Sequence, residues 1–523
     1  MLMLTSLRDI ITHWRAPERG IRDEAPLRLE LFSLEHLERH ARALATSHRL
    51  QRPGSGVALR TRLRANTALL NRAYGMVAEA APADRKLTPA ADWLVDNFYL
   101  IEEQIRIARR HLPQGYARQL PCLRDGPNAG SPRVYALALE LIAHVDGRID
   151  AAGLISFVAA YQAVVPLTLG ELWAVPIMLR LALIENLRRV AVRIIRSRHQ
   201  RNLASYWVAR MADVAEREPT RLILDVADLA RSEPELGSAF VAEFVRQIQG
   251  RNPALSLAIN WIESRLAEQG ATTEQQLLAE SQAQAADQVS IGHSIGSLRT
   301  LGAIDWREFV ETMSAVETTL RADPADAYAD QDFATRDRYR HAVETLARRA
   351  RKPEPEVAAA AVARSAEAAA SGGRQQRQAH VGWWLIGDGS RDFARAIRAR
   401  RPLLVALGDG LLAHPLALYL LALAGGAALA GGAVGFALTA IGAATWLAVV
   451  AGVVVAVAVS EPLLALINWA VTAVVTPRPL PRLDFTNGLP SDRRAAVAVP
   501  ALLSTLEGVD ELINQLEVRW LAN

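Results

Sequence analysis

The sequence predicts a mainly α-helical protein, in which an irregular multi-helix array is followed by a two-helix transmembrane hairpin and one strand-helix unit of an incomplete α/β domain. Three observations predict this order. Apolar residues recur at three- and four-residue spacing through most of residues 26–351, which is typical of core-facing helices. Residues 410–460 carry no Asp, Glu, Lys or Arg, although 22% of the chain is charged. Residues 495–499 form a short apolar run ahead of one further helical pattern.

The first part of the chain is predicted to be a helical domain. Residues 1–25 are assigned to an N-terminal tail, whose charges interrupt its apolar residues too often to predict a secretory signal. Residues 26–351 are assigned to a cytoplasmic α-helical domain. Pro and Gly divide its pattern into helices of ordinary length, with boundaries near Pro166 and Pro219. We find neither an alternating strand pattern of useful length nor a fixed repeat period, which favours an irregular helical array.

The next two segments lead towards the membrane. Residues 352–380 are predicted to be an alanine-rich helix and a flexible linker, because the polar stretch 371–378 offers nothing to bury. Residues 381–409 form a membrane-proximal segment. Its Trp383 and Trp384 are either interfacial anchors or buried core aromatics.

Residues 410–460 are predicted to be the transmembrane hairpin. A helix needs about 20 apolar residues to cross the hydrocarbon core, so this uncharged stretch allows two crossings, with a turn at 439–444. Arginines cluster on both flanks, which predicts that the N- and C-terminal parts are cytoplasmic and that the protein is multi-pass. Its glycines either let the two helices approach closely or are merely tolerated.

The apolar stretch that follows the hairpin is shorter. Residues 461–476 are predicted to form an interfacial helix, because about 14 apolar residues are too few for a crossing of ordinary length. The alternative is a third span, which would place the last segment outside, against the arginine pattern.

Residues 477–523 resemble the beginning of another domain. The run 495–499 predicts a buried strand, and a helix capped by Ser504 or Thr505 follows it. A lone buried strand leaves both of its edges unpaired. We therefore expect more chain to follow and regard the domain as incomplete.

Composition excludes some classes of function. The single Cys122 excludes an internal disulfide framework and agrees with a reducing compartment. The net charge of +4 is small for 523 residues, and basic residues alternate with acidic ones, so a nucleic-acid partner is not indicated.

The chemistry-bearing residues do not predict a catalytic or metal site. Asp330-Gln331-Asp332 spells a carboxylate string of the kind that holds a divalent metal, but no apolar strand precedes it, and we interpret it as a coincidence. Glu171 and Glu185 are predicted to form structural ion pairs with nearby arginines. The histidines, such as His144, occur singly and are assigned to caps or core hydrogen bonds.

Several strings resemble one family, the bacterial cyclic β-1,2-glucan synthases. One of them is DNFYLIEEQ at residues 96–104, and together the strings are highly specific. The similar strings span most of the chain and lie at residues 30–33, 37–41, 96–104, 132–135, 170–174, 184–189, 286–292, 297–299, 305–311 and 332–340.

The resemblance implies the N-terminal, membrane-anchoring portion of such a synthase, in the bacterial inner membrane. The family polymerises glucose from UDP-glucose into β-1,2-glucan, and the complete transferase domain is expected to use Mg²⁺ or Mn²⁺. This chain alone is expected to be non-catalytic and to carry no cofactor, with the remaining synthase domains as partners. Pro500 and Ala501 would lie on the nucleotide side of the first transferase strand. The alternative is a non-catalytic, membrane-anchored helical scaffold for a glucan-synthesis complex.

Overall fold

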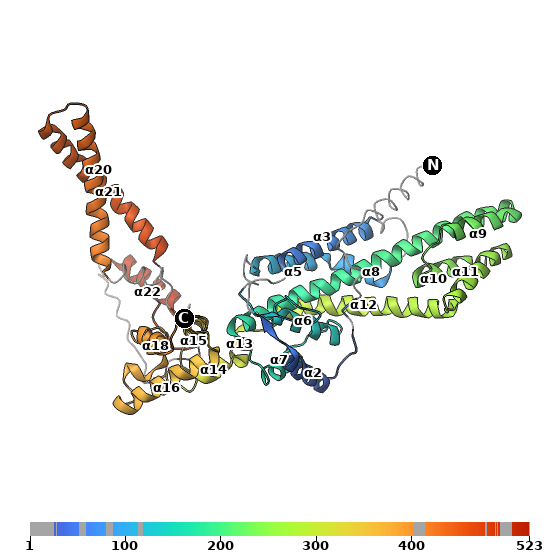
Figure 1. Ribbon diagram of the computed structural model, residues 1–523, viewed down its shortest axis with the longest axis horizontal. Coiled ribbons are helices and arrows are strands. Elements are labelled where there is room, and N and C mark those ends of the chain that lie inside the picture. Colours follow the sequence, from blue (N-terminus) through green and yellow to red (C-terminus); the bar gives the residue numbers. More distant parts are fainter. Residues whose placement is uncertain are drawn as a thin grey trace. The chain divides into compact units, whose positions relative to one another are not determined.

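The computed structural model describes residues 26–27, 29–51, 59–79, 87–112, 119–400, 414–475, 479–486, 488, 490–491 and 505–521. Over these residues the fold is mainly helical, as predicted (Figure 1). The predicted tail, residues 1–25, lies outside them. The described strands are β1 (Leu50–Gln51) and β2 (Cys122–Leu123), which pair antiparallel with Leu50 opposite Leu123.

The chain divides into two compact units, each described here by itself. The first contains the chain up to Ala322 together with Val343–Ala360, and the second contains Asp323–Ala342 together with the chain from Ala361. The division therefore does not follow the boundary expected at residue 351.

The helices of the first unit follow the apolar periodicity of the sequence. They are α2 (Leu34–Ser47), α3 (Leu59–Ala78), α4 (Pro89–Asp96), α5 (Phe98–His111), α6 (Arg133–His144), α7 (Ala151–Gln162), α8 (Leu169–Arg217), α9 (Leu222–Arg231), α10 (Ser238–Ile248), α11 (Ser256–Glu268), α12 (Thr273–Ala303), α13 (Trp306–Met313) and α14 (Ala315–Leu320), with 3-10 turns at Pro219–Arg221 and Pro253–Leu255.

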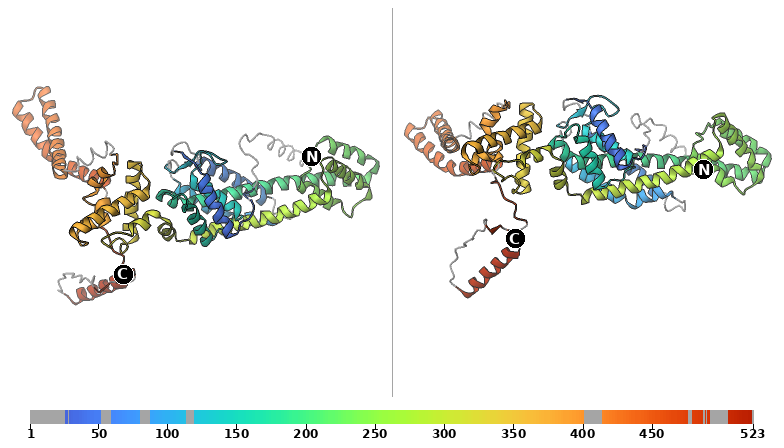
Figure 2. Two further views of the ribbon diagram at one scale, coloured as in Figure 1. Left: turned by 60° about the horizontal axis from the view of Figure 1, so that its bottom comes forward. Right: turned by 90° about the horizontal axis from the view of Figure 1, so that it is seen from below.

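Helix α8 organises this unit. It has 49 residues and begins at a capping box, in which Thr168 and Glu171 satisfy each other's backbone N–H groups. One apolar core surrounds its first half up to Ile195, and a second core, made with α9, α10 and α11, surrounds its second half from Ala204. Figure 2 shows α12 running beside α8. The expectation of ordinary helix lengths is wrong for α8 and for the 31-residue α12.

Buried ion pairs tie the first half of α8 to its neighbours. Glu171 accepts two hydrogen bonds from Arg133 of α6, at 2.8 and 2.6 Å, and both side chains are buried. Glu185 is fully buried and contacts three arginines. The prediction that both acids form structural ion pairs is confirmed, although Arg133 comes from another helix and was not identified from spacing within α8.

The second unit contains the membrane-proximal helices and the hairpin. Helices α15 (Phe333–Ala350) and α16 (Glu354–Gly372) contribute to both units. They are followed by a 3-10 turn at Arg377–Ala379 and by α17 (Val381–Leu385), α18 (Ser390–Ala396), α20 (Pro415–Ala440), α21 (Thr445–Val474) and α22 (Leu506–Leu521).

Two predictions for the C-terminal part have different outcomes. Helix α22 confirms the predicted last helix, and the Thr505 hydroxyl accepts a hydrogen bond from the Gly508 N–H, as expected of a cap. The predicted strand 495–499 lies outside the described residues. Trp384 is half-buried and donates to the carbonyl of Gln378, six residues earlier in the chain, at 2.9 Å.

Candidate functional site: an apolar hairpin and the junction at its base

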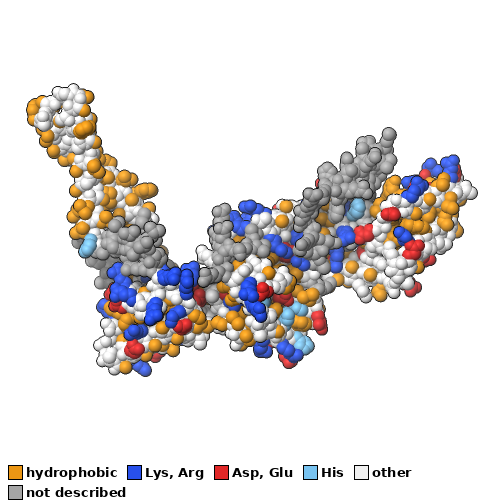
Figure 3. All heavy atoms as spheres, viewed as in Figure 1, with side chains coloured by type: hydrophobic (Ala, Val, Ile, Leu, Met, Phe, Trp, Pro, Cys, Tyr) orange, Lys and Arg blue, Asp and Glu red, His pale blue; other side chains and the backbone are white. Residues whose placement is uncertain are grey.

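Helices α20 and α21 form the predicted hairpin. They have 26 and 30 residues, which gives lengths of about 39 and 45 Å at the rise of an α-helix, enough to cross a hydrocarbon core of about 30 Å. The chain reverses between Ala440 and Thr445, as predicted for 439–444, with Gly442 at a φ of 85°. The helices pack on each other, and their large apolar side chains, such as Leu421 and Phe436, remain exposed (Figure 3). Lipid is the solvent that such a surface requires.

The two helices cross at glycines. A Cβ added to Gly431 would lie 2.3 Å from the Gly452 carbonyl oxygen, and a Cβ added to Gly452 would lie 2.9 Å from the Gly431 oxygen. Both distances are too short for a real contact, so the backbones touch only because neither residue has a side chain. Gly425 and Gly432 have no such neighbour within 4 Å. Both interpretations of the glycines therefore hold, each for different positions.

Substitution of Gly431 by valine is expected to push α20 and α21 apart by about 2 Å, the range over which interaxial distances vary with side-chain size. The Tyr419 hydroxyl donates to Asn468 Oδ1 at 2.8 Å across the hairpin. Spin labels attached through Tyr419→Cys and Asn468→Cys, in a Cys122→Ser background, would report the separation. The neighbouring Gly432→Val is the control and should leave it unchanged. Equal separations in both variants would contradict the close contact.

Helix α21 continues beyond the predicted end of the hairpin. Residues 461–476 were expected to form a separate interfacial helix, but the structure carries Glu461 and Pro462 within α21. Trp446 and Trp469 are both exposed and lie 23 residues apart, which is about 34 Å along the axis. This distance is close to the separation of the two membrane interfaces, where tryptophan is enriched. The stretch from Trp446 to Ser460 alone covers about 22 Å and is too short for a full crossing.

A junction at the base of the hairpin joins the chain after it to the chain before it. Gln331 and Leu483 form an antiparallel bridge. Its backbone hydrogen bonds run from the Asp332 N–H to the Arg482 carbonyl, at 2.9 Å, and from the Asp484 N–H to the Asp330 carbonyl, at 2.8 Å. The Asp332 side chain accepts from the Thr335 N–H at 2.9 Å at the start of α15. The carboxylate string 330–332 thus pairs with the returning chain.

Buried polar groups support the junction from inside the second unit. The Asp323 carboxylate contacts His380 Nδ1 at 2.9 Å and accepts from the Val381 N–H at 3.0 Å. His380 Nε2 lies 3.0 Å from the Gln331 side-chain amide, which also reaches the Tyr339 hydroxyl. Burial raises the pKa of Tyr339, so its hydroxyl stays protonated at neutral pH. These contacts fix Gln331, the central residue of the bridge.

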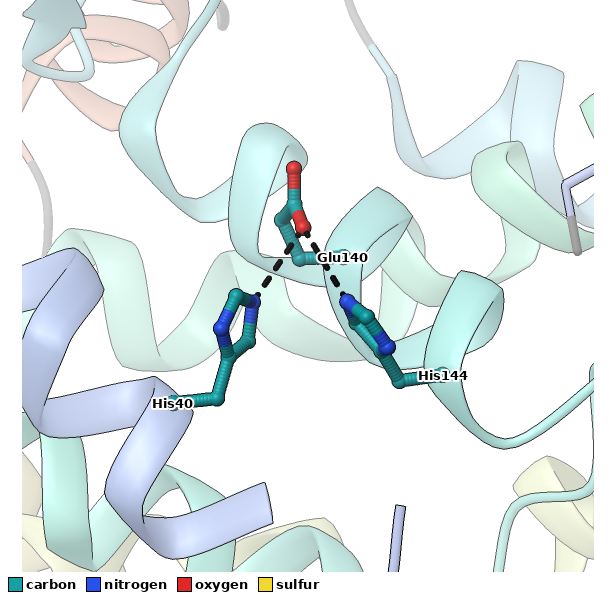
Figure 4. Close-up of side chains that lie close together, drawn as sticks. All are labelled: His40, Glu140 and His144. Carbon is teal, nitrogen blue, oxygen red and sulfur yellow. Dashed lines mark hydrogen bonds and ion pairs between the residues drawn. The ribbon is translucent and has the colours of Figure 1, made fainter. Parts of the chain in front are cut away.

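The sequence-predicted substrate residues, Pro500 and Ala501, lie outside the described residues, so the structure places neither. A group of three side chains that was not predicted as a group gathers in the first unit: His40 of α2, with Glu140 and His144 of α6 (Figure 4). Glu140 Oε2 lies 3.3 Å from His40 Nε2 and 3.8 Å from His144 Nε2. The spacing of Glu140 and His144, four residues apart on one helix, was a signal for this group.

Comparison with known proteins tests the predicted resemblance. No family model matches the sequence. The chain is 31% identical over 514 residues to the cyclic beta-(1,2)-glucan synthase NdvB of Rhizobium meliloti strain 1021. It is homologous to a part of that synthase. The alignment covers 95% of this chain and 17% of the relative, so the chain spans about a sixth of the length of NdvB. The resemblance to cyclic β-1,2-glucan synthases is confirmed, and the two apolar helices support a location at a membrane.

Proposed function

We propose that this chain is the membrane-anchoring and helical portion of a cyclic β-1,2-glucan synthase and is not catalytic by itself. The observation that carries the proposal is the homology to NdvB across nearly the whole chain, including both apolar helices. Two buried acids before the hairpin, Glu171 and Glu185, are engaged by arginines, which supports a structural role for these two side chains.

The junction supports a location of both flanks on the same side of the membrane. Residues 482–484 hydrogen-bond to residues 330–332, and this contact supports a chain that returns from the membrane to the side from which it entered. An even number of crossings is compatible with this contact, and α20 and α21 provide two crossings. Arginines flank the hairpin on both sides, as at Arg395 and Arg482, which favours the cytoplasmic side of a bacterial inner membrane.

The substrates belong to the complete synthase. We propose that UDP-glucose, the growing β-1,2-glucan and the Mg²⁺ or Mn²⁺ ion act at a transferase domain to which this chain leads, with Pro500 and Ala501 on its nucleotide side. The remaining synthase domains are then the partners of the helical units.

Glucosyl transfer tests the function. Membranes that contain only this chain should incorporate no label from UDP-[14C]glucose into glucan, whereas membranes that contain the chain extended through its transferase sequence should incorporate it. Incorporation by the 523-residue chain alone would overturn the non-catalytic assignment. Failure of both samples, with the extended protein present in the membrane, would reject the synthase assignment itself.

The topology is checked in the same membranes. In a Cys122→Ser background, Gly442→Cys in the turn should react with a membrane-impermeant maleimide added to intact, outer-membrane-permeabilised cells. Arg374→Cys and Arg482→Cys, on the two flanks, should react only after the inner membrane is opened. Labelling of one flank but not the other in intact cells would contradict the even number of crossings.

A further inference from the structure

In the group formed by His40, Glu140 and His144, the position of the His144 ring proton is fixed by a hydrogen bond. His144 Nδ1 lies 2.7 Å from the Glu30 backbone carbonyl, which can only accept, so Nδ1 is the donor. In the neutral ring, Nε2 therefore presents a lone pair, and it faces the Glu140 carboxylate at 3.8 Å. Two acceptors that face each other in this way favour a cation between them. A backbone carbonyl that orients a histidine through its other nitrogen is the usual support of a metal-binding imidazole.

The spacing of the three ligand atoms also fits a metal ion. In a tetrahedral zinc site, with bonds of about 2.0–2.2 Å, neighbouring ligand atoms lie about 3.3–3.6 Å apart. His40 Nε2 and Glu140 Oε2 are 3.3 Å apart, and all three ligand atoms lie within 4.8 Å of one another. Small rotations of the side chains would bring them to a common centre.

The surroundings are those of a partly enclosed site. The His144 side chain is 7% exposed, whereas those of His40 and Glu140 are 25% and 23% exposed, which leaves one approach open to water. The Phe32 ring stacks on His144 at a centroid distance of 3.9 Å and lies edge-to-face with the His40 ring at a centroid distance of 5.4 Å. The Phe32 N–H also donates to the His144 carbonyl at 3.1 Å. Packing against Phe32 therefore holds both histidines before any ion binds.

We propose that His40, Glu140 and His144 bind a zinc ion, with water as the fourth ligand. Two imidazoles and one carboxylate suit zinc, whereas Mg²⁺ and Ca²⁺ prefer oxygen ligands alone. The ion joins α2 to the C-terminal end of α6, across 100 residues of sequence. It fastens the first described helix and the segment before it to the core of the first unit.

Metal titration of the purified 523-residue chain in detergent tests this site. After treatment with a chelator and dialysis against zinc chloride, elemental analysis should find about one zinc per chain. Cobalt chloride should give the visible absorption bands of a tetrahedral Co²⁺ site with nitrogen and oxygen ligands. Zinc should also raise the thermal midpoint of the first unit.

Single substitutions of the ligands should weaken zinc binding by about 100-fold or more in a competition assay, because loss of an outer-shell partner of a ligand already costs about 10- to 100-fold. The variants are His40→Gln, Glu140→Gln and His144→Asn, each checked for native helicity by circular dichroism. His341→Gln is the control, because His341 faces Asp337 one helical turn away, at 3.4 Å, in the same kind of pair, and the described residues offer this pair no third ligand. It should bind zinc like the wild type.

Two outcomes would overturn the proposal. One is a wild-type chain that takes up no stoichiometric zinc and gives no tetrahedral cobalt bands, a result that does not depend on the folding of any variant. The other is equal zinc affinity in the wild type and in all three ligand variants, which would place the ion elsewhere.

Discussion

Replacement of Glu185 by glutamine is expected to lower the free energy of unfolding by about 3–5 kcal/mol, the loss typical of removing one partner from a buried ion pair. Glu185 is 0% exposed. Arg62 donates to both of its oxygens, at 3.0 and 2.8 Å, and Arg188, Arg189 and Asn66 donate at 2.8, 3.1 and 2.8 Å. A neutral amide would remove the carboxylate charge that these arginines surround.

The same network predicts the effect of acid. Burial alone would raise the pKa of Glu185, but the hydrogen bonds and charges of Arg62 and Arg188 outweigh it and hold that pKa well below its ordinary value of 4.5. A carboxyl whose pKa is lower in the folded state stabilises the fold above its ordinary pKa and loses this contribution as the pH falls. The wild type should therefore lose more stability in acid than Glu185→Gln.

Chemical denaturation of the chain in detergent, followed by circular dichroism, measures both effects. Glu35→Gln is the control, because the Glu35–Arg39 pair on α2 is largely exposed and such pairs contribute about 0–1 kcal/mol. Similar losses in the two variants would show that the arginines around Glu185 find other partners or water.

Replacement of Glu354 by glutamine is expected to stabilise the protein by roughly 3 kcal/mol at pH 8 and to have little effect near pH 4. Burial raises the pKa of Glu354 to about 7, and the charges of Glu344 and Glu171 add to this. Its carboxyl group also accepts a hydrogen bond from the Leu169 N–H, at 2.8 Å, which the glutamine oxygen can keep.

The direction in which stability changes with pH follows from proton binding. Between its ordinary pKa of 4.5 and about 7, the folded protein holds a proton on Glu354 that the unfolded chain has lost. Stability therefore falls as the pH rises through this interval, and the glutamine variant should not show that part of the fall. Thermal midpoints at a series of pH values would measure it, with the exposed Glu356→Gln on the same helix as the control. If the stability of Glu354→Gln changed with pH in the same way as that of the wild type, the raised pKa of Glu354 would be rejected.

Local patterns predicted the helical character, the hairpin and its turn. Charge is absent from 410–460 because lipid excludes it, and Gly442 allows the positive φ at which the backbone reverses. Both features depend on residues that are close in sequence, so local patterns reveal them. The end of the hairpin was not predictable in this way. The uncharged run ends at Ser460, so the hairpin was predicted to end there, but α21 continues through Glu461 and Pro462, because the residues from Leu463 onwards are mostly apolar again.

The candidate metal site could be predicted only in part. Glu140 and His144 lie on one helical face by their spacing, whereas His40 joins them through the packing of α2, a contact across 100 residues that no local pattern specifies. The same reason applies to Arg133, which reaches Glu171 from another helix. The junction between Gln331 and Leu483 likewise depends on a return of the chain over 152 positions.

The length of α8 has a consequence for the order of folding. Its two halves belong to different cores, and the stretch between Ile195 and Ala204 is held mainly by polar contacts, such as Arg201 with Glu280 at 3.2 Å. Starting a helix is costly, whereas extending one is not. The half of α8 that folds first therefore serves as the nucleus for the other half, and the second core assembles on a helix that is already growing towards it.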